Sequence, residues 1–187
     1  ERVKALRKLL LPFSALYGLI TSFRNWLFEN DLLHQRKFDI PVIGVGNLST
    51  GGTGKTPMAE YILNLLLING YKPAYLSRGY KRTTKGYFEV QTTTSAREAG
   101  DEACQIKRKF PEATVVVSED RVEGIETLLR HFPEVNVVVL DDSFQHRKVK
   151  PGLNILLTDY NRPYFNDNVL PAGNLREPSA GHKRADI

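Results

Sequence analysis

Residues 49–56 have the types and spacing of a loop that binds the phosphates of a nucleotide. The segment is Ser49-Thr50-Gly51-Gly52-Thr53-Gly54-Lys55-Thr56, and it lies between the apolar run 42–45 and a helical stretch. Glycines allow backbone N–H groups to turn towards phosphate oxygens, and the helix N-terminus adds the positive end of its dipole. In such loops the lysine reaches the β- and γ-phosphates and the threonine ligates Mg²⁺. We therefore predict nucleotide binding by residues 49–56, with Lys55 also catalytic and Thr56 a metal ligand.

One position of this loop departs from the usual pattern. Ser49 stands where the first glycine is expected, so a glycine-rich structural turn is the alternative to a phosphate site. A small residue can be accommodated there, and the strand-loop-helix context favours phosphate binding.

Paired carboxylates follow the apolar run 136–140. Asp141 and Asp142 end this predicted strand, and an acid in that place meets the Mg²⁺ shell of P-loop proteins. The carboxyl ends of parallel strands face one crevice, so these carboxylates should lie near the loop at 49–56. A turn or a helix N-cap is the alternative explanation for the pair.

Other polar residues also follow predicted strands or open predicted helices. Asp101 and Glu102 open a helix, where acids ordinarily complement the helix dipole. Arg78 follows a strand and Arg176 lies in a loop framed by proline and glycine, so both are candidates for substrate contact. His146 could bind an anionic substrate or lie on a solvated face.

Short β-branched runs alternate with helical stretches from residue 40 onwards, which is the pattern of βαβ units. The predicted strands are Pro41 to Val45, Ala74 to Ser77, Thr114 to Ser118, Asn136 to Leu140 and Asn154 to Thr158. The predicted helices are Lys55 to Ile68, Gly100 to Phe110 and Arg121 to His131. Between them, residues 82–94 are predicted to form a small hairpin or a loop excursion. The fold class is therefore α/β, a largely parallel sheet of the P-loop NTPase type flanked by helices.

The N-terminal segment has a different character. Residues 2–30 are predicted to be an amphipathic helix, with a kink or division at Pro12. Its leading basic residues are Arg2, Lys4, Arg7 and Lys8. Bulky apolar residues and Trp26 follow, as in helices that lie in the surface of an anionic membrane, and a helix packed on the core is the alternative. Polar interruptions keep the stretch below the roughly 20 apolar residues of a spanning helix, so we expect no transmembrane segment.

The composition limits the classes of partner. The chain has 187 residues, a net charge of +5 and 41% hydrophobic residues, which suits a globular domain that binds nucleic acid, anionic lipid or phosphorylated ligands. A nucleic-acid partner is disfavoured, because the aromatic residues gather in the N-terminal helix and do not alternate with basic residues along a strand. The single cysteine, Cys104, excludes an intramolecular disulfide and favours a reducing compartment. No protein partner can be inferred.

Seven segments together resemble, in order and spacing, the tetraacyldisaccharide 4′-kinase family of lipid A biosynthesis. They are Gly46-Asn47, Gly51 to Pro57, Leu76 to Tyr80, Gly100 to Glu102, Asp120-Arg121, Asp141 to Arg147 and Leu170 to Glu177. The string Asp-Asp-x-Phe-Gln-His-Arg is much more specific than the phosphate-binding loop. The resemblance extends from about residue 10 to the end of the chain.

This resemblance implies transfer of the γ-phosphate of ATP, with Mg²⁺, to the 4′-hydroxyl of a tetraacyldisaccharide 1-phosphate. It implies a lipid A precursor as partner and a peripheral location at the cytoplasmic face of the bacterial inner membrane. Residues 1–38 would be a membrane-associating helical segment, and residues 39–187 a P-loop kinase lobe.

The same resemblance implies individual roles. Asp101 takes the proton of the acceptor late in the reaction, because a carboxylate is a weak base towards a sugar hydroxyl. Glu102, Asp141 and Asp142 surround Mg²⁺. The residues implied in acceptor binding are Arg78, Arg121, Gln145, His146, Asn174 and Arg176.

Two further expectations concern the extent of the chain and a rival function. The resembling family continues into a second lobe that supplies a histidine partner for the catalytic aspartate and much of the base pocket. We therefore expect an N-terminal portion that binds phosphate with little turnover, and residues 183–187 look like the start of another strand.

The alternative function is a membrane-attached regulatory ATPase of the chromosome-partitioning type. Such ATPases carry an extra lysine before the paired glycines, where this chain has Thr50.

Overall fold

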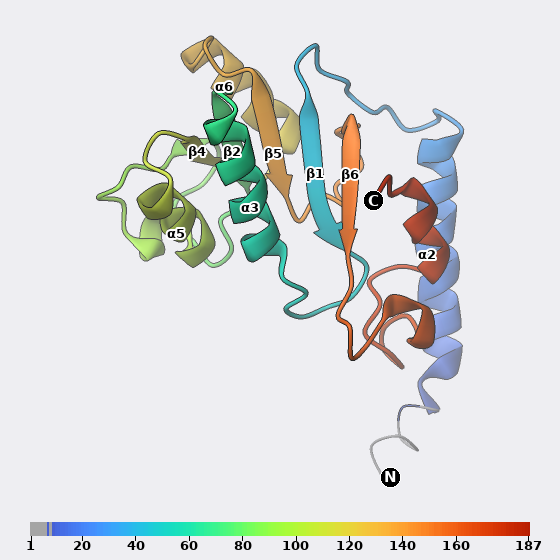
Figure 1. Ribbon diagram of the computed structural model, residues 1–187. Coiled ribbons are helices and arrows are strands. Elements are labelled where there is room, and N and C mark those ends of the chain that lie inside the picture. The colour runs from blue at the N-terminus through green and yellow to red at the C-terminus, as the bar shows by residue number, and fades with distance from the viewer. Residues whose placement is uncertain (1–6, 8) are drawn as a thin grey trace.

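The computed structural model describes residue 7 and residues 9–187, and a sheet covered by helices on both faces forms its centre (Figure 1). Arg2, Lys4 and Lys8, which belong to the predicted basic lead, lie outside the described residues.

The sheet has six strands in the order β3-β4-β2-β5-β1-β6. The strands are β1 (Val42–Asn47), β2 (Pro73–Ser77), β3 (Phe88–Glu89), β4 (Thr114–Val117), β5 (Val137–Asp141) and β6 (Leu153–Leu157). All neighbours are parallel except β3 and β4. Val45 pairs with Asp141, so the segments that follow β1 and β5 leave the sheet side by side.

Alternate side chains of the strands enter two apolar cores. The core under α3 (Lys55–Ile68) and α5 (Asp101–Lys109) includes Val45, Tyr75, Val115, Val117 and Val139. The core under α6 (Arg121–His131) includes Ala74, Leu76, Val116, Val138 and Leu140. Because both faces of the sheet are covered, the central strands are continuous apolar runs. These runs were sufficient to locate the strands in the sequence.

The structure confirms the predicted largely parallel sheet, with every predicted strand end within two residues of the observed one. α3 and α6 have the predicted bounds. A short helix, α4 (Ala96–Ala99), precedes α5 and is separated from it by Gly100, whose φ of 88° no regular helix contains. The segment 82–94 is an excursion, and its short strand β3 pairs with β4.

Helix α2 (Leu11–Glu29) runs alongside the sheet, beyond β6 (Figure 1). Leu10 is in a turn and Pro12 lies in the first helical turn, where its missing N–H removes no helical hydrogen bond. The predicted division at Pro12 therefore appears as the start of α2.

The face of α2 that packs on the protein combines two small residues with one phenylalanine near the end of the helix. The buried residues of α2 are Ser14, Gly18 and Phe28. Seven of its large apolar side chains are exposed, from 45% at Leu11 to 69% at Leu19. The helix therefore does not bury these side chains in the core. None of the described helices is both long enough and apolar enough to span a membrane.

The segment after β6 folds back between the sheet and α2 (Figure 1). It contains two 3₁₀ helices, η1 (Tyr164–Asn166) and η2 (Ser179–Arg184). Beyond η2, the Ile187 carbonyl accepts from the Leu156 N–H at 2.9 Å, beside β6. Lys183 and Arg184 belong to η2 and residues 185–187 are in no regular element, so the predicted start of a strand at 183–187 is wrong.

Candidate active site

The loop at 49–56 leaves β1 at the carboxyl edge of the sheet and leads into α3. Gly51 and Gly54 have φ values of 115° and 84°, a region in which only glycine is free of a Cβ clash. A Cβ on either residue would meet none of the described atoms within 4 Å, so the space above the backbone is open. Lys55 is the first residue of α3, and 15% of its side chain is exposed. An open turn before a helix N-terminus has the form of a phosphate cradle.

A distant loop, residues 168–176, supports this cradle. The Thr50 N–H donates to the Asn174 carbonyl at 2.8 Å, and the Arg176 N–H donates to the Leu48 carbonyl at 2.7 Å. An apolar cluster is formed by Leu48, Phe144 and Leu175. The cradle is therefore held by residues 124 positions further along the chain.

Asp141, at the end of β5, has a buried carboxylate with 3% exposure. Within the described part of the chain, its Oδ1 and the buried Tyr75 hydroxyl have no hydrogen-bonding partner. Burial, together with the nearby carboxylates of Glu102 and Asp142, raises the pKa of Asp141 to about 6. A buried carboxylate oxygen without a hydrogen-bonding partner is costly, so Oδ1 of Asp141 is suited to bind a cation.

Asp142 connects three segments of the site. Its φ of 48° is uncommon for a residue with a side chain. Its two oxygens accept from Arg176 Nη1 at 2.9 and 2.8 Å, and Oδ1 lies 3.6 Å from Lys55 Nζ. Burial opposes ionisation, but Arg176 and Lys55 outweigh it and lower the pKa of Asp142. An ionised Asp142 thus joins the start of α3 to the loop at 168–176.

The predicted metal ligands are Thr56, Glu102, Asp141 and Asp142. Among the residues that the structure describes, no three carboxylate, imidazole or thiol groups gather closely enough to hold a metal ion. Mg²⁺ in nucleotide sites requires fewer protein ligands, because waters and phosphate oxygens complete its octahedral shell. The unpartnered oxygen of Asp141 fits such a partial site, and the ligand set stays a prediction.

Asp101 and Glu102 begin α5 close to the end of β2. They line a pocket of about 140 Å³ whose other residues are Ser77, Gly79, Tyr80, Gly100 and Ala103. Both acids are exposed, and Glu102 is near enough to Asp141 to raise its pKa. The helix dipole explains acids at this position, but it does not explain the pocket beside the β5 carboxylates.

Arg121 and His146 form a basic group near the same carboxylates. Arg121 opens α6, yet its side chain turns inward and the residue is 3% exposed. Its Nη1 donates to the Ser118 carbonyl at 2.6 Å, whereas Nε and Nη2 are buried without a partner in the described structure. Burial and the charges of Arg121, Arg78 and Arg24 lower the pKa of His146 to about 4. These cations favour an anionic ligand, and Arg24 of α2 was not singled out from the sequence.

Three residues predicted to bind the acceptor use their polar groups inside the protein. Gln145 Nε2 donates to the Asn47 carbonyl at 2.9 Å, and Asn174 Nδ2 donates to Asp167 Oδ2 at 2.8 Å. Arg176 Nη1 donates to both carboxylate oxygens of Asp142. A role of these three residues in acceptor binding stays a prediction.

The sequence reasoning gave no role to two residues that shape the site. Asn47 is fully buried, and its Nδ2 donates to Thr53 Oγ1 at 2.8 Å inside the cradle. Glu177, only 4% exposed, binds donors from three segments. The position of Glu177 directly after Arg176 was the one indication in the sequence that it could belong to the site. The donors that bind its carboxylate come from distant segments, and local spacing does not identify them.

The opposite pKa shifts of Asp141 and His146 predict a specific dependence of stability on pH. Asp141 has a pKa of about 6 in the folded protein instead of 3.8, so the folded state holds a proton that the unfolded state loses between these pH values. The contribution of Asp141 to the free energy of unfolding therefore decreases as pH rises through this interval, by up to about 3 kcal/mol. Folded His146 is protonated only near pH 4 rather than 6.5, so its contribution increases as pH rises through that interval. In the wild type the two contributions oppose each other.

Single substitutions should separate the two contributions. We expect the free energy of unfolding of Asp141→Asn to rise with pH between about 4.5 and 6.5, and that of His146→Gln to fall over the same interval. Urea denaturation at several pH values measures both slopes. If both variants keep the wild-type slope, these groups do not have the shifted pKa values.

Comparisons with known proteins give consistent matches. The sequence model of the family described as "LpxK: Tetraacyldisaccharide-1-P 4'-kinase" matches residues 6–187. A tetraacyldisaccharide 4'-kinase of Flavobacterium johnsoniae is 52% identical over 182 residues, which are 97% of this chain and 53% of the relative. One of Bacteroides thetaiotaomicron is 51% identical over 188 residues, which are 100% of this chain and 49% of the relative. The chain thus spans about half the length of the curated relatives it matches.

The fold also matches a solved structure. It is the crystal structure of the "apo" form of LpxK from Aquifex aeolicus in complex with ATP, with a TM-score of 0.88 and 45% sequence identity. The match covers 97% of this chain and 57% of that chain. None of these matches supports the chromosome-partitioning alternative.

Proposed function

The chain belongs to the tetraacyldisaccharide-1-P 4'-kinase family, and on this basis we propose that it is the phosphate-transferring part of an ATP-dependent lipid A 4′-kinase. The proposed acceptor is the 4′-hydroxyl of a tetraacyldisaccharide 1-phosphate, a lipid A precursor. The observation that carries the proposal is the convergence of groups at one sheet edge. There the cradle at 49–56, the Asp101 pocket and the cations around His146 surround the β5 carboxylates.

The donor side of the proposed reaction rests on the cradle. Backbone N–H groups of residues 49–56 would bind the ATP phosphates, and Lys55 would neutralise charge that develops on the transferring phosphoryl group. Lys55 already lies beside Asp142, so its ammonium group is held at this edge before the nucleotide binds. Bound Mg²⁺ would neutralise the phosphate oxygens, with Thr56, Glu102, Asp141 and Asp142 as the proposed ligand set.

The acceptor side rests on Asp101 and the basic group. Asp101 would orient the 4′-hydroxyl and accept its proton as the bond from this oxygen to the γ-phosphorus forms. The bond from the γ-phosphorus to the bridging oxygen breaks, and ADP leaves with that oxygen. The unpartnered N–H groups of Arg121, with Arg78 and His146 nearby, would bind the anionic part of the acceptor. The low pKa of His146 leaves its imidazole neutral near pH 7, so the charge there comes from the arginines.

A direct experiment tests the proposed reaction. The protein at the full length of its relatives is incubated with ATP, Mg²⁺ and the tetraacyldisaccharide 1-phosphate, and the lipid products are separated by phosphate content. A bisphosphorylated lipid that requires all three components supports the proposal. Its absence from a folded, nucleotide-binding protein would exclude this kinase function.

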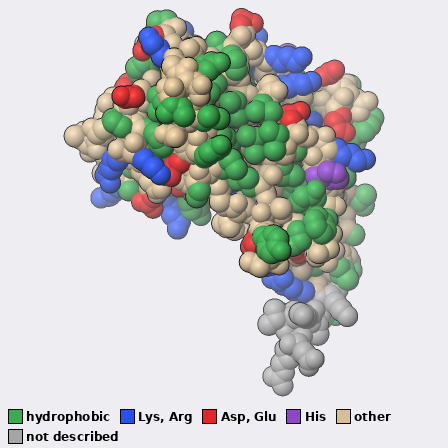
Figure 2. Space-filling model, viewed as in Figure 1, with side chains coloured by type: hydrophobic (Ala, Val, Ile, Leu, Met, Phe, Trp, Pro, Cys, Tyr) green, Lys and Arg blue, Asp and Glu red, His purple; other side chains and the backbone are tan. Residues whose placement is uncertain are grey.

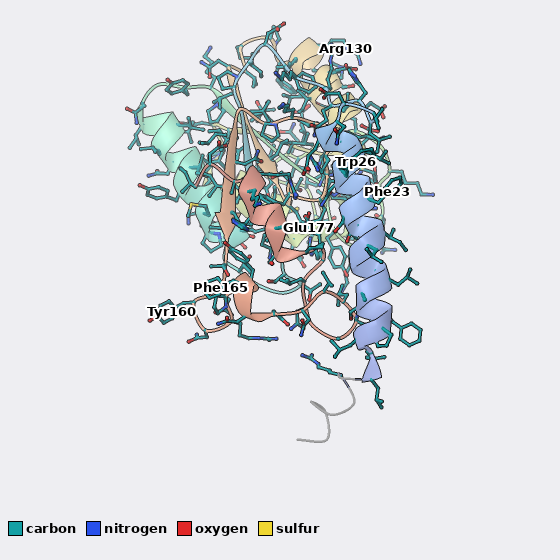
Figure 3. The ribbon with its side chains drawn as sticks, turned by 90° about the vertical axis from the view of Figure 1, so that its right-hand side faces the viewer. Phe23, Trp26, Arg130, Tyr160, Phe165 and Glu177 are labelled. Carbon is teal, nitrogen blue, oxygen red and sulfur yellow. The ribbon has the colours of Figure 1, made fainter. Side chains whose placement is uncertain are left out.

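We also propose that α2 holds the protein peripherally at the surface of the inner membrane, on its cytoplasmic face. Its exposed apolar residues are Leu11, Phe13, Leu16, Leu19, Ile20, Phe23 and Trp26. These residues follow helical spacing, and α2 lies at the margin of the molecule with side chains directed outward (Figure 3). An acceptor that remains anchored in lipid requires a kinase that works at the headgroup layer, and this face of α2 can bind there.

Substitution of the α2 face should release the protein from membranes. We expect the triple variant Phe13→Ser, Leu16→Ser, Phe23→Ser to bind vesicles of phosphatidylethanolamine and phosphatidylglycerol at least about 100-fold more weakly, because three large apolar groups no longer leave water. Cosedimentation with vesicles measures the change.

The chain offers a matched control. Apolar side chains also gather over α3 (Figure 2), where Tyr61, Leu65 and Ile68 are 64%, 46% and 70% exposed. Replacing these three by serine should leave vesicle binding within about twofold, since α2 is intact. Equal losses in both variants would mean that general apolar exposure, and not α2, binds the vesicles.

A further inference from the structure

Glu177 has a buried carboxylate at the meeting point of three segments. The residue is 4% exposed and lies between α2 and η2 (Figure 3). Its oxygens accept from Asn25 Nδ2 of α2 at 2.6 Å, from Gln145 Nε2 at 3.1 Å, and from Arg184 Nη2 of η2 at 2.9 and 2.8 Å. Several donors thus converge on one carboxylate in a site with little solvent.

Gln145 connects this carboxylate to the phosphate-binding edge. Its Nε2 also donates to the carbonyl of Asn47, the last residue of β1, at 2.9 Å. Its Oε1 accepts from Arg176 Nη1 at 3.2 Å, and the same Nη1 binds Asp142. A continuous chain of polar contacts therefore runs from Glu177 through Gln145 to the backbone before the cradle and to Arg176.

Helix α2 is tied to the same region at further points. The Tyr17 hydroxyl donates to the Arg176 carbonyl at 2.8 Å, and Ser14 Oγ accepts from the Ala172 N–H at 2.9 Å. Arg24 Nη2 donates to the Gln145 carbonyl at 3.3 Å. The inner face of α2 therefore contacts the loop that supports the cradle and the segment that follows β5.

We propose that Glu177 is a positioning residue of this site. Its carboxylate holds the Gln145 amide, and Gln145 in turn holds the Arg176 side chain and the Asn47 carbonyl, so that the cradle and the Asp142–Arg176 pair keep one geometry. Asn25 brings α2 into the same contact. The expected effect of Glu177 on phosphate transfer rests on the proposed kinase function. Its effect on the geometry of the cradle does not.

The chemistry of the contact requires an ionised acceptor. Three donor groups face Glu177, and a carboxylate offers lone pairs to all of them. A glutamine would direct its own NH₂ group at one of these donors and leave that donor buried without an acceptor. The alternative is that Glu177 serves only to pair with Arg184 and so holds η2 in place.

Hydrogen exchange distinguishes the two explanations without any activity measurement. In Glu177→Gln we expect the Thr50 and Arg176 amides, which bond to Asn174 and Leu48, to exchange at least about tenfold faster. In Arg184→Gln, which removes the ion pair but keeps the Gln145 contact, the two amides should stay within about twofold. Equal acceleration in both variants, or none in Glu177→Gln, would overturn the positioning role.

A second substitution keeps the inference testable if Glu177→Gln does not fold. Gln145→Ala removes the connecting amide and leaves the Glu177–Arg184 pair in place. It should accelerate exchange of the same two amides at least about tenfold. Unchanged exchange in Gln145→Ala would also overturn the proposal.

Kinetics at the full length of the relatives provide a further measurement. We expect Glu177→Gln to lower kcat about tenfold, and to lower it less than twofold further when added to Gln145→Ala, because Glu177 acts through the Gln145 amide. Multiplicative losses in the double variant would contradict action through Gln145. If the wild type transfers no phosphate at all, the proposed function fails, whereas the exchange result still decides the role of Glu177.

Discussion

Replacement of Lys55 by alanine is expected to lower the rate of phosphate transfer by about 10²–10³-fold, the range found when one preorganised group that stabilises transition-state charge is removed. Lys55 begins α3 beneath the open cradle, and its Nζ lies 3.6 Å from Asp142 Oδ1. The nearby cation Arg176 is held by both oxygens of Asp142, so it is not free to take over the role of Lys55. Transfer of labelled γ-phosphate measures the rate, and ATP binding should weaken as well, because Lys55 also contacts the β- and γ-phosphates in the proposed site.

The control for Lys55 is a lysine of equal charge elsewhere. Lys109 lies at the end of α5, 56% exposed, and pairs with Glu60. Lys109→Ala removes the same charge from the protein and should keep the transfer rate within about twofold, because exposed ion pairs contribute little. If Lys55→Ala also stays within twofold of the wild type, the cradle does not bind the reacting phosphates.

Replacement of Asp101 by alanine is the second change with a large expected effect. We expect the transfer rate to fall by about 10²–10⁴-fold, the range attributed to a positioned acid or base, while ATP binding stays within about threefold. The separation is expected because Asp101 lines the pocket at the start of α5 and is not part of the loop at 49–56. Transfer kinetics and equilibrium ATP binding on the same preparation measure the two quantities.

A helix-dipole role for Asp101 requires its own control. Glu123 is an exposed acid in the first turn of α6 and complements that helix dipole in the same way. Glu123→Ala should leave transfer within about twofold, since the dipole contribution acts on stability. Normal turnover by Asp101→Ala would show that its carboxylate has no role in the reaction.

The sequence alone was sufficient to predict the elements and the place of the glycine-rich turn between β1 and α3, whose role in phosphate binding stays a prediction. Strands β1, β2, β4, β5 and β6 and helices α3 and α6 were found because both sheet faces are covered, which makes the strands apolar runs between turn residues. The cradle was found because its glycines, lysine and threonine act within eight consecutive residues, so their spacing carries the geometry. The resemblance then supplied Asp101, whose local setting alone was that of an ordinary helix start.

Local patterns could not predict how the remaining polar residues are used. Gln145 and Asn174 are equally compatible with a ligand or an internal contact, and the structure bonds them to Asn47 and Asp167. Arg121 is the first residue of α6, where a solvated side chain is usual, yet it is buried against the β5 carboxylates. In each case the outcome depends on which distant segment lies opposite.

The N-terminal helix illustrates the same division. Its composition allowed either a membrane-surface helix or a core helix, because both contain large apolar residues at helical spacing. The tertiary structure decided which face is free, since Ser14 and Tyr17 bond to residues 158 and 159 positions away and leave Phe13, Leu16 and Phe23 exposed.

The sequence by itself determined the elements and the phosphate cradle, because these depend on neighbours in the chain. Only the tertiary structure decided the pairing of Asp142 with Arg176, the contacts of Glu177 and the outward face of α2, because these depend on packing between distant segments.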